Sequence, residues 1–236
     1  MAIAARPGDI GFYRDSGPYL LAFFLLAIPA FWPTYWAPAF ERDWHVHLHG
    51  ASLFAWAAML VAQPWLIHRG RVRLHRQLGK LSYLLAPMVV ISTLLLAHYR
   101  LQSARSFDQV YFLWVQLGLI TLFAVAYAQA IRHRRSAGIH ARYMVCTALA
   151  MLDPIVARLL FNLFGVDIPA SQLCTYTIID AILVALWIRD ARTGNGILVF
   201  PRMLAAYLVI ELPTFALPQT AAWEACVEFY SLLPLP

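Results

Sequence analysis

Apolar residues run through this chain in stretches of helical length, and short polar segments separate them. Seven stretches are visible, at about 18–38, 47–67, 80–99, 109–131, 143–164, 171–189 and 203–220. A helix that crosses the hydrocarbon core of a bilayer needs roughly 20 mostly apolar residues, and each stretch is about that long. The pattern therefore predicts an all-α polytopic bundle of about seven transmembrane helices, forming a single integral membrane domain over residues 1–236.

The composition agrees with a membrane protein. Hydrophobic residues make up 61% of the chain and charged residues 13%, and the mean hydropathy is +0.64, whereas a soluble domain carries about 25% charged residues. The polar start has Arg6, Asp9 and Arg14 but no apolar core before Tyr19. Because a signal peptide needs such a core, we expect the first apolar run to remain in the membrane as a span.

The basic residues alternate between the two sides of the predicted bundle. If the N-terminus is inside, three basic residues fall in outer segments, Arg42, Arg100 and Arg105, and Arg158 lies within a span. The other fourteen of the 18 fall in inner segments. Lys and Arg are retained on the cytoplasmic side, so the bias predicts a cytoplasmic N-terminus and a C-terminus outside. These arginines flank spans in short loops, so the expected partner is the lipid bilayer and not a nucleic acid.

An internal repeat relates two of the predicted inner loops. Segment 68–84 (HRGRVRLHRQLGKLSYL) aligns with 133–149 (HRRSAGIHARYMVCTAL) at an offset of 65 residues, so that His75 matches His140. The repeat unit would be a helical hairpin, about 47–99 and then about 109–164. We expect these duplicated hairpins, spans 2–3 and 4–5, to form a four-helix core. The alternative is that short arginine-rich loops look alike because topology demands it.

Two histidines of the first hairpin are candidate axial ligands. His49 and His98 are equally far in sequence from the middle of the loop between their spans. This predicts that the two side chains lie at the same depth in the membrane, on neighbouring antiparallel helices. Two imidazoles placed in this way are able to ligate a haem iron axially or to share a smaller metal. The alternative is a pair of interfacial histidines that are hydrogen-bonded to water or carbonyls. Residues at the two ends of any symmetric hairpin lie at the same depth, so this arrangement does not by itself indicate a ligand.

The run His45, His47, His49 is a second candidate metal site. An extended backbone would project all three rings from one side, whereas a helix would place His45 and His49 on one face. Neutral imidazole suits copper and zinc, so both metals are alternatives to haem.

Two inner histidines, His75 and His140, are an alternative haem pair. Each immediately precedes a span and each recurs in the repeated unit, so they are expected to face one another. His68 and His133 are interpreted as packing residues at the junctions of loop and helix.

Charged residues inside the predicted spans are the remaining candidates. Asp153, Asp180 and Glu211 lie near the middles of spans 5, 6 and 7. Arg158 is also in span 5, five residues after Asp153 and nearer the outside. Ionisable residues inside a membrane are functional candidates by default. The three acids predict a proton or ion path, and Arg158 is expected to contact an anionic cofactor group or an acid. The alternative is a buried ion-pair network that fixes helix register.

Three short motifs carry a resemblance to a family. The HRQLGK stretch at 75–80, the IHARYM stretch at 139–144 and the LDP stretch at 152–154 resemble uncharacterised bacterial multi-pass membrane proteins with His-Arg-x-Leu-Gly and His-x-Arg-x-Met loop motifs. The resemblance covers about 45–165 and implies a bacterial cytoplasmic (inner) membrane. Such proteins are similar in layout to bis-histidine membrane cytochromes b. At the repeat offset His49 maps to Trp114 and His98 to Leu163, so at most one outer haem is implied.

The leading hypothesis is a histidine-ligated cofactor, haem b, in electron transfer or respiratory-complex assembly, with a redox partner or larger membrane complex. Arg158 would then lie beside a propionate. Three alternatives stay open: a transporter of ions, protons or small solutes that uses the three acids, a metal-dependent membrane enzyme that uses the 45–49 histidines, and a cofactor-free accessory subunit. Whether the protein is an enzyme is left open by the sequence.

Overall fold

The structure is a computed structural model that describes residues 8–37, 41–103, 106–193 and 198–236, and regular structure in these residues is helical throughout. The elements are α1 (Gly8–Arg14), α2 (Gly17–Phe31), η1 (Trp32–Trp36), α3 (Trp44–His68), α4 (Val72–Gly79), α5 (Ser82–Ser103), α6 (Phe107–Arg132), α7 (Ala137–Phe164), α8 (Ile168–Arg192), α9 (Val199–Glu211), η3 (Leu217–Gln219) and α10 (Ala221–Ser231). The all-helical prediction is confirmed for this part of the chain.

Six helical segments in the described residues are long and apolar enough to cross a membrane. They are Gly17–Trp36, Trp44–His68, Val72–Ser103, Phe107–Arg132, Ala137–Phe164 and Ile168–Arg192. The seventh expected span corresponds to α9, which has 13 residues and gives way to a turn at Leu212 and Pro213. At 1.5 Å per residue α9 is about 20 Å long, which is shorter than the roughly 30 Å hydrocarbon core.

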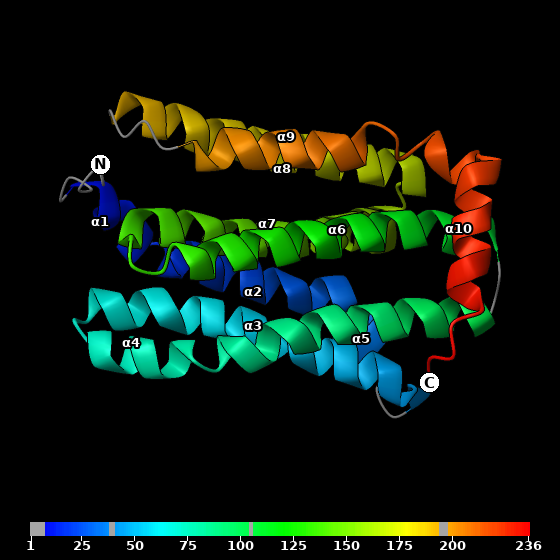
Figure 1. Ribbon diagram of the computed structural model, residues 1–236, viewed down its shortest axis with the longest axis horizontal. Helices are drawn as coiled ribbons and strands as arrows, with labels where there is room; N and C mark the ends of the chain where they lie inside the picture. Colours follow the sequence, from blue (N-terminus) through cyan, green and yellow to red (C-terminus); the bar gives the residue numbers. More distant parts are fainter. Residues whose placement is uncertain (1–7, 38–40, 104–105, 194–197) are drawn as a thin grey trace.

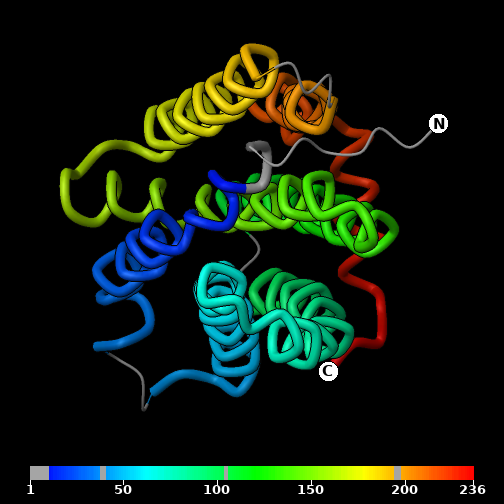
Figure 2. Tube along the Cα trace, turned by 90° about the vertical axis from the view of Figure 1, so that its left-hand side faces the viewer, coloured from blue at the N-terminus to red at the C-terminus, as the bar shows by residue number. Residues whose placement is uncertain are grey.

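The helices lie side by side in three layers (Figure 1). Helices α8 and α9 form one outer layer, α6 and α7 the middle layer, and α3, α4 and α5 the other outer layer, with α2 beside the middle layer in the end view (Figure 2). Helix α2 packs on both α3 and α7, and α5 packs on α6. The middle layer is therefore in contact with most of the bundle, and a site between the layers is built from many helices.

Helix α3 packs on α5, and helix α6 packs on α7. Helix α4 occupies the same place in its hairpin as the first turns of α7, because residues 72–79 align with 137–144 at the offset of 65. The first hairpin interrupts its second helix with a turn at Lys80 and Leu81, whereas the second hairpin continues unbroken. Descent of the two hairpins from one duplicated unit stays a prediction.

The C-terminal helix α10 runs across the end of the bundle, transverse to the long helices (Figure 1). Thr220 caps it by accepting a hydrogen bond from the Trp223 backbone N–H at 3.2 Å. The Trp223 indole donates to the Val110 carbonyl on α6 at 3.1 Å, and the Tyr230 hydroxyl donates to the Leu94 carbonyl on α5 at 2.6 Å. Burial raises the pKa of Tyr230 to about 12, so its hydroxyl keeps the proton it donates. These contacts hold α10 across the ends of α5 and α6.

Candidate functional site

A cavity of about 700 Å³ opens within the bundle, between α2, α3, α5, α6, α7 and α8. Its walls are mainly apolar and include the rings of Phe23, Phe31 and Phe123. Two further wall residues, Phe54 and Phe161, are 48% and 51% exposed on the outside of the bundle. The cavity therefore reaches the surface that would face lipid, and its volume falls in the usual range of about 300–1,000 Å³ for small-molecule sites.

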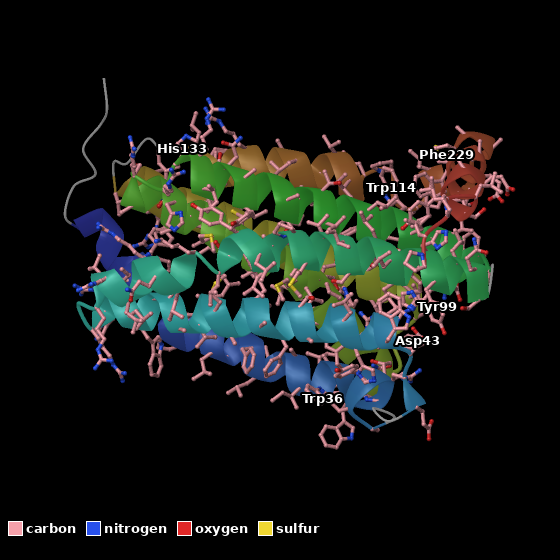
Figure 3. All side chains as sticks on the ribbon, turned by 60° about the horizontal axis from the view of Figure 1, so that its bottom comes forward. Trp36, Asp43, Tyr99, Trp114, His133 and Phe229 are labelled. Carbon is pink, nitrogen blue, oxygen red and sulfur yellow. The ribbon has the colours of Figure 1, made fainter. Side chains whose placement is uncertain are left out.

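Polar residues interrupt the apolar wall of the cavity. They include His49, Thr93, Arg100, Gln109, Gln116, Asp153, Arg158, Asn162 and Gln172. His49 lies five residues after the start of α3, and Arg100 lies in the last turn of α5. Asp43 and Tyr99, which lie close to these positions in the chain, are at one end of the bundle, whereas His133 is at the opposite end (Figure 3). His49 and Arg100 thus line the cavity near the end that the charge pattern predicts to be outer.

Thr93 orients the His49 ring. The Thr93 hydroxyl donates to the Val89 carbonyl at 2.7 Å, and its Oγ1 lies 3.4 Å from His49 Nδ1. Because the hydroxyl proton is already used, the His49 contact requires Nδ1–H as the donor, which leaves the lone pair on Nε2. A hydrogen bond to the far nitrogen is how a ligating imidazole is usually held, so His49 has the arrangement of a ligand that faces a cavity.

Two guanidinium groups face the same cavity. Arg158 donates to the Pro154 carbonyl at 3.2 Å and stacks on the Phe31 ring with 4.7 Å from Cζ to the ring centroid. Neither Arg158 nor Arg100 forms an ion pair within 4.0 Å with a residue that the structure describes. Their charges are nevertheless close enough to interact with each other and with His49. The site is therefore positively charged and lined by apolar groups.

Asp153 is the acid of the cavity wall. It is 2% exposed, and its Oδ2 accepts a hydrogen bond from Gln172 Nε2 on α8 at 2.6 Å. A single carboxylate is unable to neutralise both arginines, so the cavity keeps an excess of positive charge even when Asp153 is ionised.

The three histidines of the 45–49 run do not meet, because His47 lies on the opposite side of α3 from His45 and His49. Asp43 caps α3 by accepting from the His45 backbone N–H at 2.9 Å, which lowers the pKa of Asp43 below its ordinary value of 3.8. Because this cap starts the helix before His45, successive histidines lie about 200° apart around it. No group of three or more His, Cys, Asp or Glu residues within the described ranges is placed to hold a metal ion.

Each of these histidines has its own surroundings. His45 is buried, stacks on Tyr99 at 4.5 Å between ring centroids, and has Asp43 on Nδ1 and the Pro236 carbonyl 2.9 Å from Nε2. His47 is exposed, and its Nδ1 lies 3.4 Å from the Tyr35 hydroxyl. Of the three, His49 alone lines the cavity.

His49 and His98 are not brought together in the cavity. His49 contacts Thr93 across the hairpin, and His98 is five residues further along α5, about 140° around the helix. His98 is buried against Tyr230 of α10, with 5.6 Å between ring centroids, and its Nε2 has no partner among the described residues. The actual register of α3 against α5 pairs His49 with Thr93 and His45 with Tyr99, because the turn around α4 is not symmetric.

The inner pair, His75 and His140, lies at the opposite end. Their charges are close enough to interact. Nδ1 of His140 lies 2.9 Å from the Ala130 carbonyl, and Nδ1 of His75 meets the Gln63 side chain once its amide is oriented to donate. In both rings Nε2 is left as the nitrogen for another partner. Nδ1 of His68 lies 2.7 Å from the Asp15 carboxylate, and Nδ1 of His133 lies 2.9 Å from the Gln129 carbonyl.

The three predicted acids separate into two places. Asp153 belongs to the cavity, whereas Asp180 on α8 and Glu211 on α9 lie against each other between those two helices. Arg158 faces the cavity with Asp153 and forms no ion pair with either of the other two acids. The acids therefore do not form one continuous row, and any path between them must use other side chains.

Sequence reasoning did not select Arg100 or Gln172 as site residues. Arg100 was interpreted as an outer-loop charge, but it follows Thr93 by seven residues and so shares its face of α5. No sequence pattern around Gln172 marks it as a site residue, because only the packing of α8 on α7 brings it to Asp153.

No protein-family model, curated protein or solved structure matches this chain. The function is therefore inferred from the site itself.

Proposed function

We propose that this protein is an integral membrane protein that binds an anionic amphipathic cofactor, haem b, in the cavity, and that its role is electron transfer. One observation carries the proposal: an apolar cavity of about 700 Å³ presents one imidazole and two arginines that lack an ion-pair partner among the described residues. Six helical segments of the described residues are long and apolar enough to cross a membrane, which supports an apolar environment for the cavity.

Charge is the first reason for this assignment. Keeping a charged guanidinium out of water costs free energy unless an anion compensates its charge. Arg158 has a carbonyl and a ring as neighbours, and Asp153 is the acid that shares the cavity wall with it. An anionic group between Arg100 and Arg158 would compensate both charges. The apolar remainder of the cavity would accept a hydrophobic body attached to that group.

The position of His49 is the reason for haem b among such molecules. Haem b combines an apolar ring with two carboxylates and takes an imidazole nitrogen as its axial ligand. His49 Nε2 would be that ligand, Thr93 would hold the ring through Nδ1, and the two arginines would hold the carboxylates. When bound, the group supplies one-electron chemistry, and this chain supplies orientation, charge compensation and an apolar surround.

The test is the visible spectrum of the detergent-purified protein, oxidised and dithionite-reduced, with iron measured per chain. We expect a Soret band and about one iron per chain, and loss of both in His49→Ala. His47→Ala is the matched control, because His47 is two residues away on the same helix, exposed and outside the cavity. We expect it to keep the spectrum.

Three other results would revise the proposal. A colourless, iron-free protein from haem-replete cells excludes haem b. Mass spectrometry of the same sample then decides whether an anionic lipid co-purifies through Arg100 and Arg158, which would retain the anion site with a different ligand. A spectrum that survives His49→Ala but is lost in His75→Ala or His140→Ala would move the haem to the inner pair.

A further inference from the structure

A pair of carboxyl groups lies between α8 and α9, away from the cavity. Asp180 and Glu211 are within hydrogen-bonding reach of each other. Glu211 is 6% exposed, and Asp180 is partly buried. Within the described ranges, neither Asp180 Oδ1 nor Glu211 Oε1 has a hydrogen-bond donor.

Two carboxylates in contact repel each other, and burial makes the repulsion stronger. A basic group would relieve it, but neither acid has an ion pair within 4.0 Å among the residues that the structure describes. A proton on one of the two carboxyl groups relieves the repulsion and also supplies the missing donor. Such a pair titrates as a unit.

Other titratable groups surround the pair. Tyr207 precedes Glu211 by one turn on α9 and is 1% exposed, and its hydroxyl has no partner among the described residues. Cys146 and Asp153 on α7 and Tyr111 on α6 complete the set on the packed elements. None of these groups is a base that would hold the pair doubly ionised. The Tyr207 hydroxyl is a second buried polar group without a described partner, on the same face of α9 as Glu211.

One face of α8 connects the pair to the cavity. Gln172, Tyr176 and Asp180 follow each other at four-residue intervals, so they lie in one row along the helix. Gln172 is in the cavity wall, where it binds Asp153. Tyr176 is buried between the two ends of the row, and its hydroxyl lies 3.0 Å from Thr214 Oγ1.

We propose that Asp180 and Glu211 hold a single shared proton inside the bundle and exchange it with the cavity along the Gln172–Tyr176 face of α8. In the exchange one proton leaves the acid pair and one arrives on the Asp153 carboxylate. The Tyr176 hydroxyl accepts one proton and releases another, so it ends unchanged. The proton site does not depend on which group occupies the cavity, and its test uses no cofactor.

The test is infrared spectroscopy of the purified protein in lipid films, near neutral pH. A protonated carboxyl group has a carbonyl stretch separate from the carboxylate bands, and it shifts when the proton is exchanged for deuterium. We expect this band in the wild type and its loss in Asp180→Asn and in Glu211→Gln. Asp108→Asn is the control, because Asp108 is an exposed acid at the start of α6. Asp153→Asn identifies any band that belongs to the cavity acid.

The exchange route is tested by the rate at which the band shifts after transfer to deuterated buffer. We expect Tyr176→Phe to slow the shift, whereas Tyr83→Phe, at a 51% exposed tyrosine on α5, leaves the rate unchanged. The proposal of a shared proton is overturned if the wild type has no protonated-carboxyl band. It is also overturned if a band that persists in Asp153→Asn survives in both Asp180→Asn and Glu211→Gln. A rate that Tyr176→Phe does not change overturns the route along α8. The wild-type spectrum decides the first point even if a variant fails to fold.

Discussion

Breaking the buried ion pair between Arg142 and Asp190 by a single substitution should strongly destabilise the fold. Arg142 on α7 is 0% exposed and Asp190 on α8 is 1% exposed. The guanidinium binds the carboxylate at two points, 2.6 Å from Nε to Oδ2 and 2.8 Å from Nη2 to Oδ1. It also donates to the Gly138 carbonyl at 2.9 Å, and the Tyr13 hydroxyl donates to Asp190 at 3.3 Å.

Removing one partner of this pair leaves the other charge buried. We expect Arg142→Met to lower the free energy of unfolding by about 3–5 kcal/mol, the range for a broken buried pair, because Asp190 then keeps a buried charge without its two short bonds to Arg142. Arg189 remains 3.8 Å from Asp190, which places the expected loss toward the lower end of this range. An exposed pair would cost only about 0–1 kcal/mol. Asp190→Leu should cost a similar amount, since it leaves the guanidinium without its carboxylate.

The assay is a double-mutant cycle with reversible unfolding in mixed micelles of SDS and a mild detergent, followed by circular dichroism. The double variant Arg142→Met with Asp190→Leu removes both charges, so it should lose clearly less than the sum of the two single losses. Single losses of about 1 kcal/mol or less that add without coupling would refute the reasoning. They would mean that water reaches the pair.

Two further predictions concern packing and pH. A Cβ at Gly118 on α6 would overlap the Ile210 side chain on α9, so Gly118→Ala should lower the free energy of unfolding by about 1–3 kcal/mol. Adding Ile210→Ala to this variant should recover part of the loss. An unchanged unfolding midpoint in Gly118→Ala would contradict this contact. The lowered pKa of Asp43 means that its cap stabilises the fold fully above the ordinary value of 3.8 and less as pH falls through the lower folded value. The unfolding midpoint should therefore fall less steeply with acid in Asp43→Asn than in the wild type, and identical slopes would show that the cap does not contribute.

Local hydrophobicity was sufficient to predict the membrane-length helices, because crossing a bilayer depends on the length and polarity of each segment alone. Asp43, which precedes the 45–49 histidines in the chain, and His133 lie at opposite ends of the bundle (Figure 3), in agreement with the predicted outer and inner groups. The seventh run was harder to interpret, because hydropathy does not register that α9 ends at Glu211 before Pro213. That His75 and His140 face one another stays a prediction from the repeat, and the interaction between their charges agrees with it.

Tertiary structure alone decided which polar residues meet. Whether a side chain faces a cavity depends on the rotation and register of its helix, and these are set by packing against other helices. The turn around α4 shifts α5 along α3, so that Thr93 and not His98 meets His49. The packing of α8 on α7 brings Gln172 to Asp153 and Asp190 to Arg142. The sequence by itself determined the helices and the ends at which their polar residues lie, and the contacts between helices determined the site.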